Sequence, residues 1–380
     1  MPQDLDPFHA ISIGNLAFKL ASEGRSIIHM EYGMPSAPPP AAATQAAQHM
    51  MDSGIPGYWE SGPLREKIAA RYYTLYGLEV APERIFLTCG ASPALVLALS
   101  LAFKPGDHVA IARPGYVAYR NTMKALHLKP QEIPCGPGSR FQLTAAALAD
   151  SDRPLNGVLI SSPANPTGAI IKPDELQRIA RFCQEQNLPV ISDEIYHQLS
   201  YDLRTQSMLA YAPDALVVNS FSKYFCMPGW RLGWLVVPPR LIEPATAYLG
   251  NMFLTAPSLA QAAALEALEA KPELDAHIKT YRANRALMLA ALPKLGLERI
   301  APPDGAFYIY ADISKFTSDS LAFCMKLLKD TGVATAPGID FDPIDGHKFM
   351  RFSFAVTTAQ VKDALARLEA WFGAYTASAR

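Results

Sequence analysis

Residues 157–192 read GVLISSPANPTGAIIKPDELQRIARFCQEQNLPVIS. The segment begins and ends with short apolar runs, 157–161 and 189–192, which are typical of buried parallel strands. Between them, Pro173 stands at a first-turn position with two acidic residues behind it, and Asn187 closes the helical pattern. A strand, a helix and a second strand in this order predict a βαβ unit and therefore an α/β fold.

The same alternation extends to both sides, from about residue 83 to residue 237. Short runs rich in Val, Ile and Leu alternate there with longer helical patterns, which predicts a mostly parallel sheet covered by helices. A helix at about 92–103 is apolar all round, so we expect it to be buried. The predicted strands are 85–88, 108–112, 157–161, 189–192, 215–219 and 232–237.

The two ends of the chain differ from this core. Residues 35–40 are rich in proline and alanine, and short strands are expected at 307–311 and 348–354 among C-terminal helices. A chain of 380 residues, half of them hydrophobic, is also longer than one compact core usually accommodates. We therefore expect a large domain at 46–285 and a smaller α+β domain built from both chain ends, 1–45 and 286–380.

Composition argues against several classes of protein. With 34 Lys and Arg against 35 Asp and Glu, the net charge of -1 gives no field that would hold nucleic acid or an acidic membrane surface. The five cysteines are scattered, without a C-x-x-C pair, so we expect reduced thiols, a cytoplasmic location and no metal site. The first six residues are acidic, and no apolar run reaches the roughly 18 residues of a membrane span, so we expect neither a cleaved leader nor a membrane segment.

A lysine segment follows the predicted strand 215–219. The motif S-F-S-K ends at Lys223, and G-W-R ends at Arg231. A lysine behind a buried strand loses hydration, which lowers its pKa and makes its amine available to an aldehyde cofactor. The alternative is an ordinary solvated side chain, but the hydroxyls of Ser220 and Ser222 and the guanidinium of Arg231 would suit a phosphate group beside it.

Polar residues also follow two neighbouring predicted strands. Asp193 of D-E-I-Y could accept a hydrogen bond from a protonated ring nitrogen, which would keep a cofactor ring a strong electron sink. Helix capping by Asp193 and core packing by Tyr196 are the alternatives. The turn N-P-T-G places the amide of Asn165 at another strand end, although it could merely reverse the chain. Ligands of open parallel sheets bind beyond the carboxyl ends of the strands, so we expect these residues to converge.

Three further segments complete the set. Gly90, Ala91 and Ser92 form a small-residue turn that opens a helix, and a helix N-terminus binds phosphate. Tyr116 of P-G-Y-V-A-Y is either a core aromatic or a ring that stacks on a ligand. Arg351 of M-R-F-S-F lies among apolar residues, as an edge charge or as a buried anion receptor.

In this order, these segments resemble the class I/II aminotransferases, which are pyridoxal phosphate (PLP) enzymes of fold type I, similar to aspartate aminotransferase. The resemblance runs from about Gly33 to Arg351 and implies an L-amino acid and a 2-oxo acid as substrates. It implies PLP on Lys223, Asp193 at the pyridine nitrogen and both Tyr196 and Asn165 at the phenolic oxygen. It further implies ring stacking by Tyr116, a phosphate site at Gly90, Ala91, Ser92, Ser220, Ser222 and Arg231, and a carboxylate site at Arg351 with Gly33 and Asn165.

One segment departs from the family pattern. Residues 57–65, GYWESGPLR, resemble a family stretch in which a tyrosine reaches the cofactor phosphate of the neighbouring subunit. The resemblance therefore implies a homodimer with shared active sites. Fewer residues separate Tyr58 from the L-R pair than the family pattern predicts, which leaves the role of Tyr58 open.

The implied reaction is transfer of an amino group by a ping-pong mechanism, with Lys223 moving the α-proton. A C-S β-lyase of the same fold is the alternative, because the motifs around the cofactor are common to both. A non-catalytic binding protein of this fold would usually lack the lysine, the arginine or the aspartate, and this chain keeps all three. A dicarboxylic substrate would require a second guanidinium, for which Arg113 and Arg120 are candidates with equal standing as solvated charges.

Overall fold

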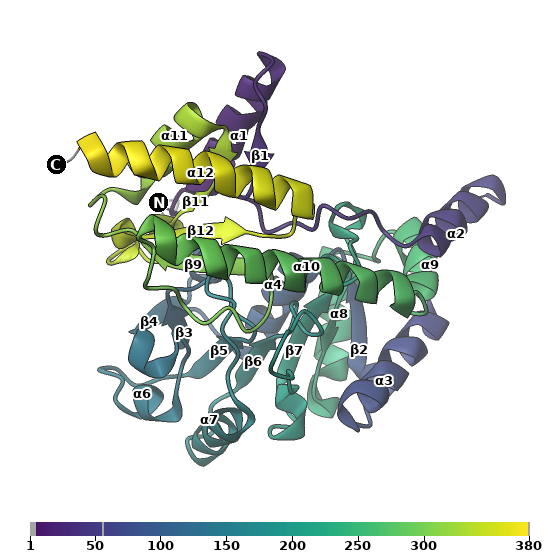
Figure 1. The fold of residues 1–380 in the computed structure, drawn as a ribbon. Coiled ribbons are helices and arrows are strands. Elements are labelled where there is room, and N and C mark those ends of the chain that lie inside the picture. The colour runs from purple at the N-terminus through teal and green to yellow at the C-terminus, as the bar shows by residue number, and fades with distance from the viewer. Residues whose placement is uncertain (1–4, 55–56, 379–380) are drawn as a thin grey trace.

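The centre of the molecule is a seven-stranded sheet with the strand order β2-β8-β7-β6-β5-β3-β4 (Figure 1). The computed structural model describes residues 5–54 and 57–378, so that Met1 to Asp4, on which the expectation about a leader partly rests, lie outside it. Strand β8 is antiparallel to both β2 and β7, and the other neighbouring pairs are parallel. The strands are β2 Ile85–Thr88, β3 His108–Arg113, β4 Lys129–Pro134, β5 Gly157–Ser161, β6 Val190–Asp193, β7 Leu216–Ser220 and β8 Gly233–Val236.

The mostly parallel α/β sheet expected from the sequence is confirmed, and six of its seven strands coincide with predicted segments to within one residue at each end. Strand β4 was not predicted. It reads KPQEIP and lies at the edge of the sheet, where Pro130 and Pro134 are tolerated although they cannot donate ladder hydrogen bonds.

Helices cover both faces of this sheet. On one face pack α4 (Ala91–Ala102), α5 (Val117–Ala125) and α8 (Ile242–Met252). On the other face pack α3 (Gly62–Tyr76), α6 (Ala145–Ala149) and α7 (Pro173–Glu185). In β5, Leu159 belongs to the hydrophobic cluster on the face covered by α4, α5 and α8. Val158 and Ile160 belong to the cluster on the face covered by α3, α6 and α7. Because both faces are covered, the central strands are apolar at nearly every position.

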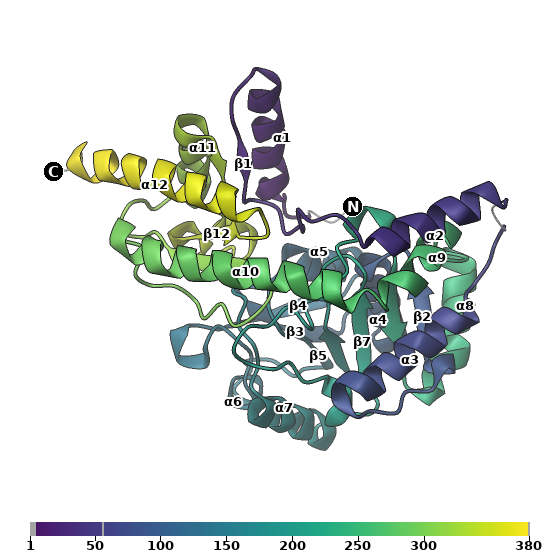
Figure 2. The same cartoon turned by 45° about the vertical axis from the view of Figure 1, so that its right-hand side comes forward.

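The two ends of the chain meet in a separate region beside the sheet (Figures 1 and 2). The N-terminal strand β1 (Ile28–His29) pairs in parallel with β10 (Val333–Ala334), next to the three-stranded antiparallel sheet β11-β12-β9. Strands β9 and β12 lie where short C-terminal strands were expected. The other elements of this region are α1 His9–Ser22, β9 Tyr308–Asp312, α11 Ser320–Thr331, β11 Ala336–Pro337, β12 Phe349–Ser353 and α12 Thr358–Ser378.

Three further helices connect the central sheet to this region. Helix α2 (Ala41–Asp52) packs along α9 (Ser258–Ala267), and α10 (Lys271–Ala291) runs across the molecule (Figure 2). Helices α2 and α10 span the expected domain boundaries at residues 45 and 285, and the division into two domains stays a prediction. Within the described parts of the chain, none of the helices combines the length and the apolar character that crossing a membrane demands.

Candidate active site

A cavity of about 240 Å³ lies beyond the carboxyl ends of β5, β6 and β7, where strand-end residues of the large sheet meet residues from both chain ends. Most of the predicted site residues line it, whereas Gly90, Ser220 and Tyr58 do not. The predicted residues that line it are Gly33, Ala91, Ser92, Tyr116, Asn165, Asp193, Tyr196, Ser222, Lys223, Arg231 and Arg351.

The turn after β7 presents Lys223 to the cavity. Ser222 N donates to Ser220 Oγ over 3.1 Å, and the two serine hydroxyls lie 2.8 Å apart, so Ser220 supports the turn from beneath. Lys223 Nζ donates to the carbonyl oxygen of Gly33. Burial, reinforced by the positive charge of Arg351, lowers the pKa of Lys223 to about 8. At pH 7 roughly a tenth of the amine is then neutral, far more than for an ordinary lysine, and only the neutral form can act as a nucleophile or a base.

Asp193 ends β6 and is buried at the base of the cavity. Burial raises the pKa of its carboxyl group, while hydrogen bonds from Tyr119 and Ile195 and the charge of Lys223 act in the opposite direction. Tyr119 Oη donates to Oδ2 over 2.7 Å, and the Ile195 amide donates to Oδ1 over 3.1 Å. These bonds fix the orientation of the Asp193 carboxylate, which can accept a hydrogen bond from a protonated nitrogen.

Sequence reasoning missed Tyr119, although a signal for it exists. It stands three residues after Tyr116 in P-G-Y-V-A-Y, at the start of α5, and the two rings meet edge to face with centroids 5.5 Å apart. Residues three apart lie on the same side of a helix, so a tyrosine that lines the site predicts its neighbour.

Arg351 is a fully buried cation without a carboxylate partner. It stands in β12, 1% exposed, and none of the ion pairs among the described residues includes it. Its Nη1 donates to Asn165 Oδ1 over 2.8 Å, its Nη2 donates to the carbonyl oxygen of Glu31, and its Nε has no hydrogen-bond partner within the described residues. A buried guanidinium that lacks its counter-ion is a receptor for an incoming carboxylate.

The bond from Arg351 also orients Asn165. A guanidinium group only donates hydrogen bonds, so the oxygen of the Asn165 side chain must face it. The Asn165 Nδ2 group is left to donate elsewhere, on a side chain that is buried and lines the cavity.

A second wall of small groups lies at the N-terminus of α4. Gly90 precedes this helix with a φ of 102°, and a Cβ atom at this position would lie 2.5 Å from Arg231 Nη2. Glycine therefore lets Arg231 approach the turn, where its Nη2 donates to Cys89 O over 3.3 Å. With the amides of Ala91 and Ser92 in the first turn of the helix, this corner of the cavity suits a phosphate group.

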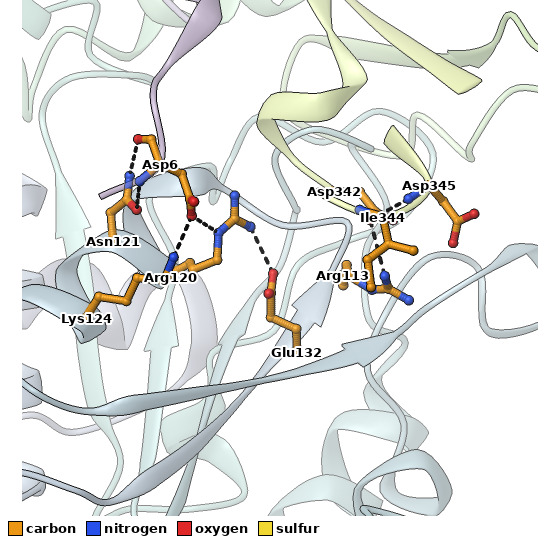
Figure 3. Close-up of polar contacts among 9 residues, drawn as sticks. All are labelled: Asp6, Arg113, Arg120, Asn121, Lys124, Glu132, Asp342, Ile344 and Asp345. Atoms are coloured by element: carbon orange, nitrogen blue, oxygen red, sulfur yellow. Dashed lines mark hydrogen bonds and ion pairs between the residues drawn. The ribbon is translucent and has the colours of Figure 1, made fainter. Parts of the chain in front are cut away.

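Arg113 and Arg120 are neither solvated nor part of the cavity, which corrects the expectation for both (Figure 3). Arg113 Nη1 lies 3.4 Å from Asp342 Oδ1. Arg120 lies 2.6 Å from Asp6 Oδ2 through Nε and 2.9 Å from Glu132 Oε1 through Nη1. A single sequence could not assign Asp342 to Arg113 or Asp6 to Arg120, because these carboxylates come from distant parts of the chain.

Tyr58 lies outside the cavity of its own chain and is 84% exposed. Several cavity residues, by contrast, had no sequence motif at all. Their positions depend on how the chain ends fold over the sheet, which local patterns do not encode. These residues include Phe8, Tyr32 and Tyr308.

Known proteins share this chain's sequence and fold over nearly its full length. A family model described as aminotransferase class I and II matches residues 27–368. The valine–pyruvate aminotransferase of Mycobacterium tuberculosis strain H37Rv is 45% identical over 372 residues, 96% of each chain. The crystal structure of an aminotransferase from Mycobacterium tuberculosis superposes with a TM-score of 0.95 at 44% identity, covering 97% of each chain. That of Thermus thermophilus aspartate aminotransferase with maleate gives 0.89 at 29% identity, covering 96% of each chain.

The similarity is therefore not confined to the motifs around the cavity but extends through the sheet and both chain ends. The chain belongs to the class I and II aminotransferase family, whose members use PLP, and it is an aminotransferase.

Proposed function

We propose that this aminotransferase binds PLP at Lys223 and moves the amino group of an L-amino acid with an apolar side chain to a 2-oxo acid. The observation that carries the proposal is the presence of Lys223 and Arg351 in one cavity. The first is an amine whose lowered pKa suits reaction with an aldehyde. The second is a buried guanidinium that forms no ion pair with another described residue. The carboxylate of an amino acid substrate can pair with it.

The donor and acceptor groups in the cavity fit PLP. Asn165 binds Arg351 through its oxygen, so its Nδ2 group can donate to PLP. Gly90 leaves room for Arg231 beside the N-terminus of α4, where the PLP phosphate would bind. When bound, PLP supplies an electron sink for the negative charge that develops at the substrate α-carbon. Asp193 would hold the ring nitrogen, Tyr196 and Asn165 the phenolic oxygen, Tyr116 the ring face, and Ala91, Ser92, Ser222 and Arg231 the phosphate.

Within this arrangement Arg351 would orient the substrate and Lys223 would transfer the proton. Arg351 would bind the α-carboxylate through two parallel hydrogen bonds, which fixes the orientation of the bond to be broken. Lys223 Nζ would remove the α-proton and return it at a neighbouring atom, as a general base and then as a general acid. Arg351 is one carboxylate receptor for two carboxylate-bearing substrates, so the first product must leave before the second substrate binds. This supports a ping-pong cycle.

The walls of the cavity support apolar substrates. Phe8, Leu95, Ala118 and Ile195 contribute apolar surface. The cationic side chains that line the cavity are Lys223, Arg231 and Arg351, each of which already has a role, and Arg113 and Arg120 are paired elsewhere. A relative that is 45% identical is a valine–pyruvate aminotransferase. A branched aliphatic amino acid and pyruvate are therefore the proposed substrates.

A homodimer with shared active sites is the proposed assembly. Several large apolar side chains are exposed on α2, on α8 and on the segment that leads into α3, and exposed apolar surface of this kind favours association. Arg231 lines the cavity and is nevertheless exposed, as expected where a second subunit completes the wall. The exposed side chains are Met51, Tyr58, Tyr248, Met252 and Leu254.

A role in amino acid metabolism follows from the aminotransferase activity, and we propose a cytoplasmic location for it. All five cysteines are free thiols, four of them buried, which supports a reducing compartment.

The proposal is tested by half-reactions of the PLP-loaded protein with single amino acids and no oxo acid. L-valine and L-alanine should yield one equivalent of oxo acid per site, at least about tenfold faster than L-aspartate or L-glutamate, because a charged side chain would lie unpaired against apolar walls. Equal or faster reaction of the acidic amino acids would contradict the apolar substrate class. Lys223→Ala should abolish the absorbance of protein-bound PLP, whereas Lys129→Ala, at an exposed strand-end lysine, should retain it.

A further inference from the structure

Tyr308 is a cavity residue to which the sequence motifs assign no role. It begins β9, is fully buried and lines the cavity together with Lys223 and Arg351. Its Oη lies 2.6 Å from Tyr196 Oη, in a buried hydrogen bond that joins β9 to the turn after β6. Tyr196 is the residue proposed to donate to the phenolic oxygen of PLP. Tyr308 therefore reaches the cofactor site through Tyr196.

Two further contacts hold Tyr308 in place. The guanidinium carbon of Arg351 lies 4.5 Å from the centroid of its ring. A Cβ atom at position 33 would overlap Tyr308 Oη, so Gly33 leaves the space that the hydroxyl occupies. The carbonyl oxygen of Gly33 accepts the hydrogen bond from Lys223. Tyr308 is thus packed among the residues on which the proposed function depends.

Either phenol could donate in this bond, and the role of Tyr196 toward bound PLP decides which of the two does. Burial raises the pKa of both Tyr196 and Tyr308, and Arg351 lowers both. The other titratable groups that act on the pair are Tyr119 and Tyr116. A phenol has a single proton, so a Tyr196 that donates to the phenolic oxygen of bound PLP must accept the bond from Tyr308, which then is the donor.

We propose that Tyr308 is a positioning residue that donates to Tyr196 Oη and thereby directs the proton of Tyr196 toward the phenolic oxygen of bound PLP. The inference rests on the proposed function, because it requires PLP at Lys223. A hydroxyl that accepts one hydrogen bond is polarised into a stronger donor, and its rotation is restricted. Tyr308 strengthens the bond from Tyr196 without touching the cofactor.

The consequence is measurable in the pH dependence of the absorbance of bound PLP. Tyr196 and the proton on the Lys223 nitrogen compete for the same phenolic oxygen, so a stronger bond from Tyr196 favours loss of that proton. Removal of the Tyr308 hydroxyl should therefore raise the pH midpoint. A hydrogen bond of ordinary strength corresponds to a rise of roughly half to one pH unit.

The experiment compares Tyr308→Phe with Tyr310→Phe, each as PLP-loaded full-length protein. Tyr310 is a matched control because it stands two residues along β9, is equally buried, lies outside the cavity and has no hydrogen-bond partner for its Oη within the described residues. Tyr308→Phe should raise the midpoint and lower kcat several-fold with little change in KM, and Tyr310→Phe should change neither. An unshifted midpoint in Tyr308→Phe overturns the proposal, as does failure of this variant to bind PLP, because a positioning residue leaves attachment at Lys223 intact.

A double-mutant cycle separates positioning from general support of the fold. In a Tyr196→Phe background, the further change Tyr308→Phe should add no shift, because its effect passes through the lost hydroxyl. An equal shift in both backgrounds would assign Tyr308 a structural role and overturn the proposal. If the wild-type protein shows no absorbance of bound PLP, the proposed function itself fails, and this outcome is distinct from an unshifted midpoint.

Discussion

The reactivity of Lys223 depends on its surroundings more than on its chemical type. Burial is the larger cause of its lowered pKa and Arg351 the second, which brings the value from 10.5 to about 8. The neutral amine attacks the aldehyde, so the rate at which cofactor-free protein takes up PLP should rise with pH and level off above about 8. The rate of PLP uptake, followed by absorbance at a series of pH values, measures this midpoint. Free Nα-acetyl-lysine, measured in parallel, provides the behaviour of an unperturbed lysine amine. Arg351→Gln should raise it, and a midpoint near 10.5 in the wild type would contradict the expectation.

Arg351 differs from Lys223 because it stays charged although it is buried. Its proposed ion-pair partner is the carboxylate of the substrate. Replacement by methionine should lower kcat/KM for the amino acid by roughly 100-fold or more, because two charge-assisted hydrogen bonds are lost. The melting temperature should be unchanged or higher, since an unpaired buried charge is removed. Steady-state kinetics and thermal unfolding of the same preparation provide both values. A large fall in melting temperature with unaltered kcat/KM would assign Arg351 to the fold rather than to the substrate.

The N-terminal segment 5–8 shows how a short element without regular structure can shape the cavity (Figure 3). Asp6 Oδ2 lies 2.6 Å from Arg120 Nε and 2.9 Å from Lys124 Nζ, which ties the segment to α5. Asp340 accepts the His9 and Ala10 amides over 2.7 and 2.8 Å, which ties the start of α1 to the C-terminal region. Phe8 lies between these attachments and lines the cavity.

Loosening of this segment should weaken substrate binding. Asp6→Asn should raise KM for L-valine about three- to fivefold with little change in kcat, since a partly exposed ion pair contributes up to about 1 kcal/mol. Faster hydrogen exchange at the Asp6 amide, which donates to Asn121 Oδ1 over 3.0 Å, should accompany the change even without cofactor. Asp363→Asn, which breaks the exposed pair with Arg367, is the matched control. Unaltered exchange and KM in Asp6→Asn would rule out this role for the segment.

Sequence patterns predicted the elements that depend on local chemistry and failed for those that depend on distant contacts. The central strands are apolar because helices cover both faces, so composition alone marks them. Strand β4 is half-exposed at the sheet edge and contains Pro130 and Pro134, which removes that signal. Asp193 ends a buried strand, and Asn165 and Lys223 come within a few residues of the ends of two others, so all three were recognisable by position.

Other site residues are brought to the sheet by the chain ends. Glu31 and Gly33 come from the segment after β1, and Arg351 and Tyr308 from β12 and β9, which pair with each other. Bonds from Arg351 to Asn165 and from Lys223 to Gly33 then join the two regions across the cavity. Closure of the site thus depends on the arrangement of the whole chain, which a single sequence does not encode in any local pattern.

Beyond the single chain, the exposed Tyr58 and the exposed Arg231 lead to a prediction about assembly. If Tyr58 completes the site of a neighbouring subunit, Tyr58→Ala and Lys223→Ala damage different sites of a dimer. Each variant alone should be strongly impaired. A hybrid dimer, however, contains one site with an intact Lys223 and an intact Tyr58 from its partner.

Mixing the two variants under conditions that allow subunits to reassociate should therefore restore activity. With random exchange, half of the dimers are hybrids with one intact site each, so the mixture should recover about a quarter of the wild-type activity. Size-exclusion chromatography checks that the preparation is dimeric. A mixture of Lys223→Ala with Asp193→Ala serves as the control, because each change damages the site of its own subunit and the hybrid keeps no intact site. Recovery in the first mixture alone would establish shared sites. No recovery from a protein shown to exchange subunits would mean that Tyr58 serves no neighbouring site, in keeping with its shortened distance to residues 64 and 65 in the sequence.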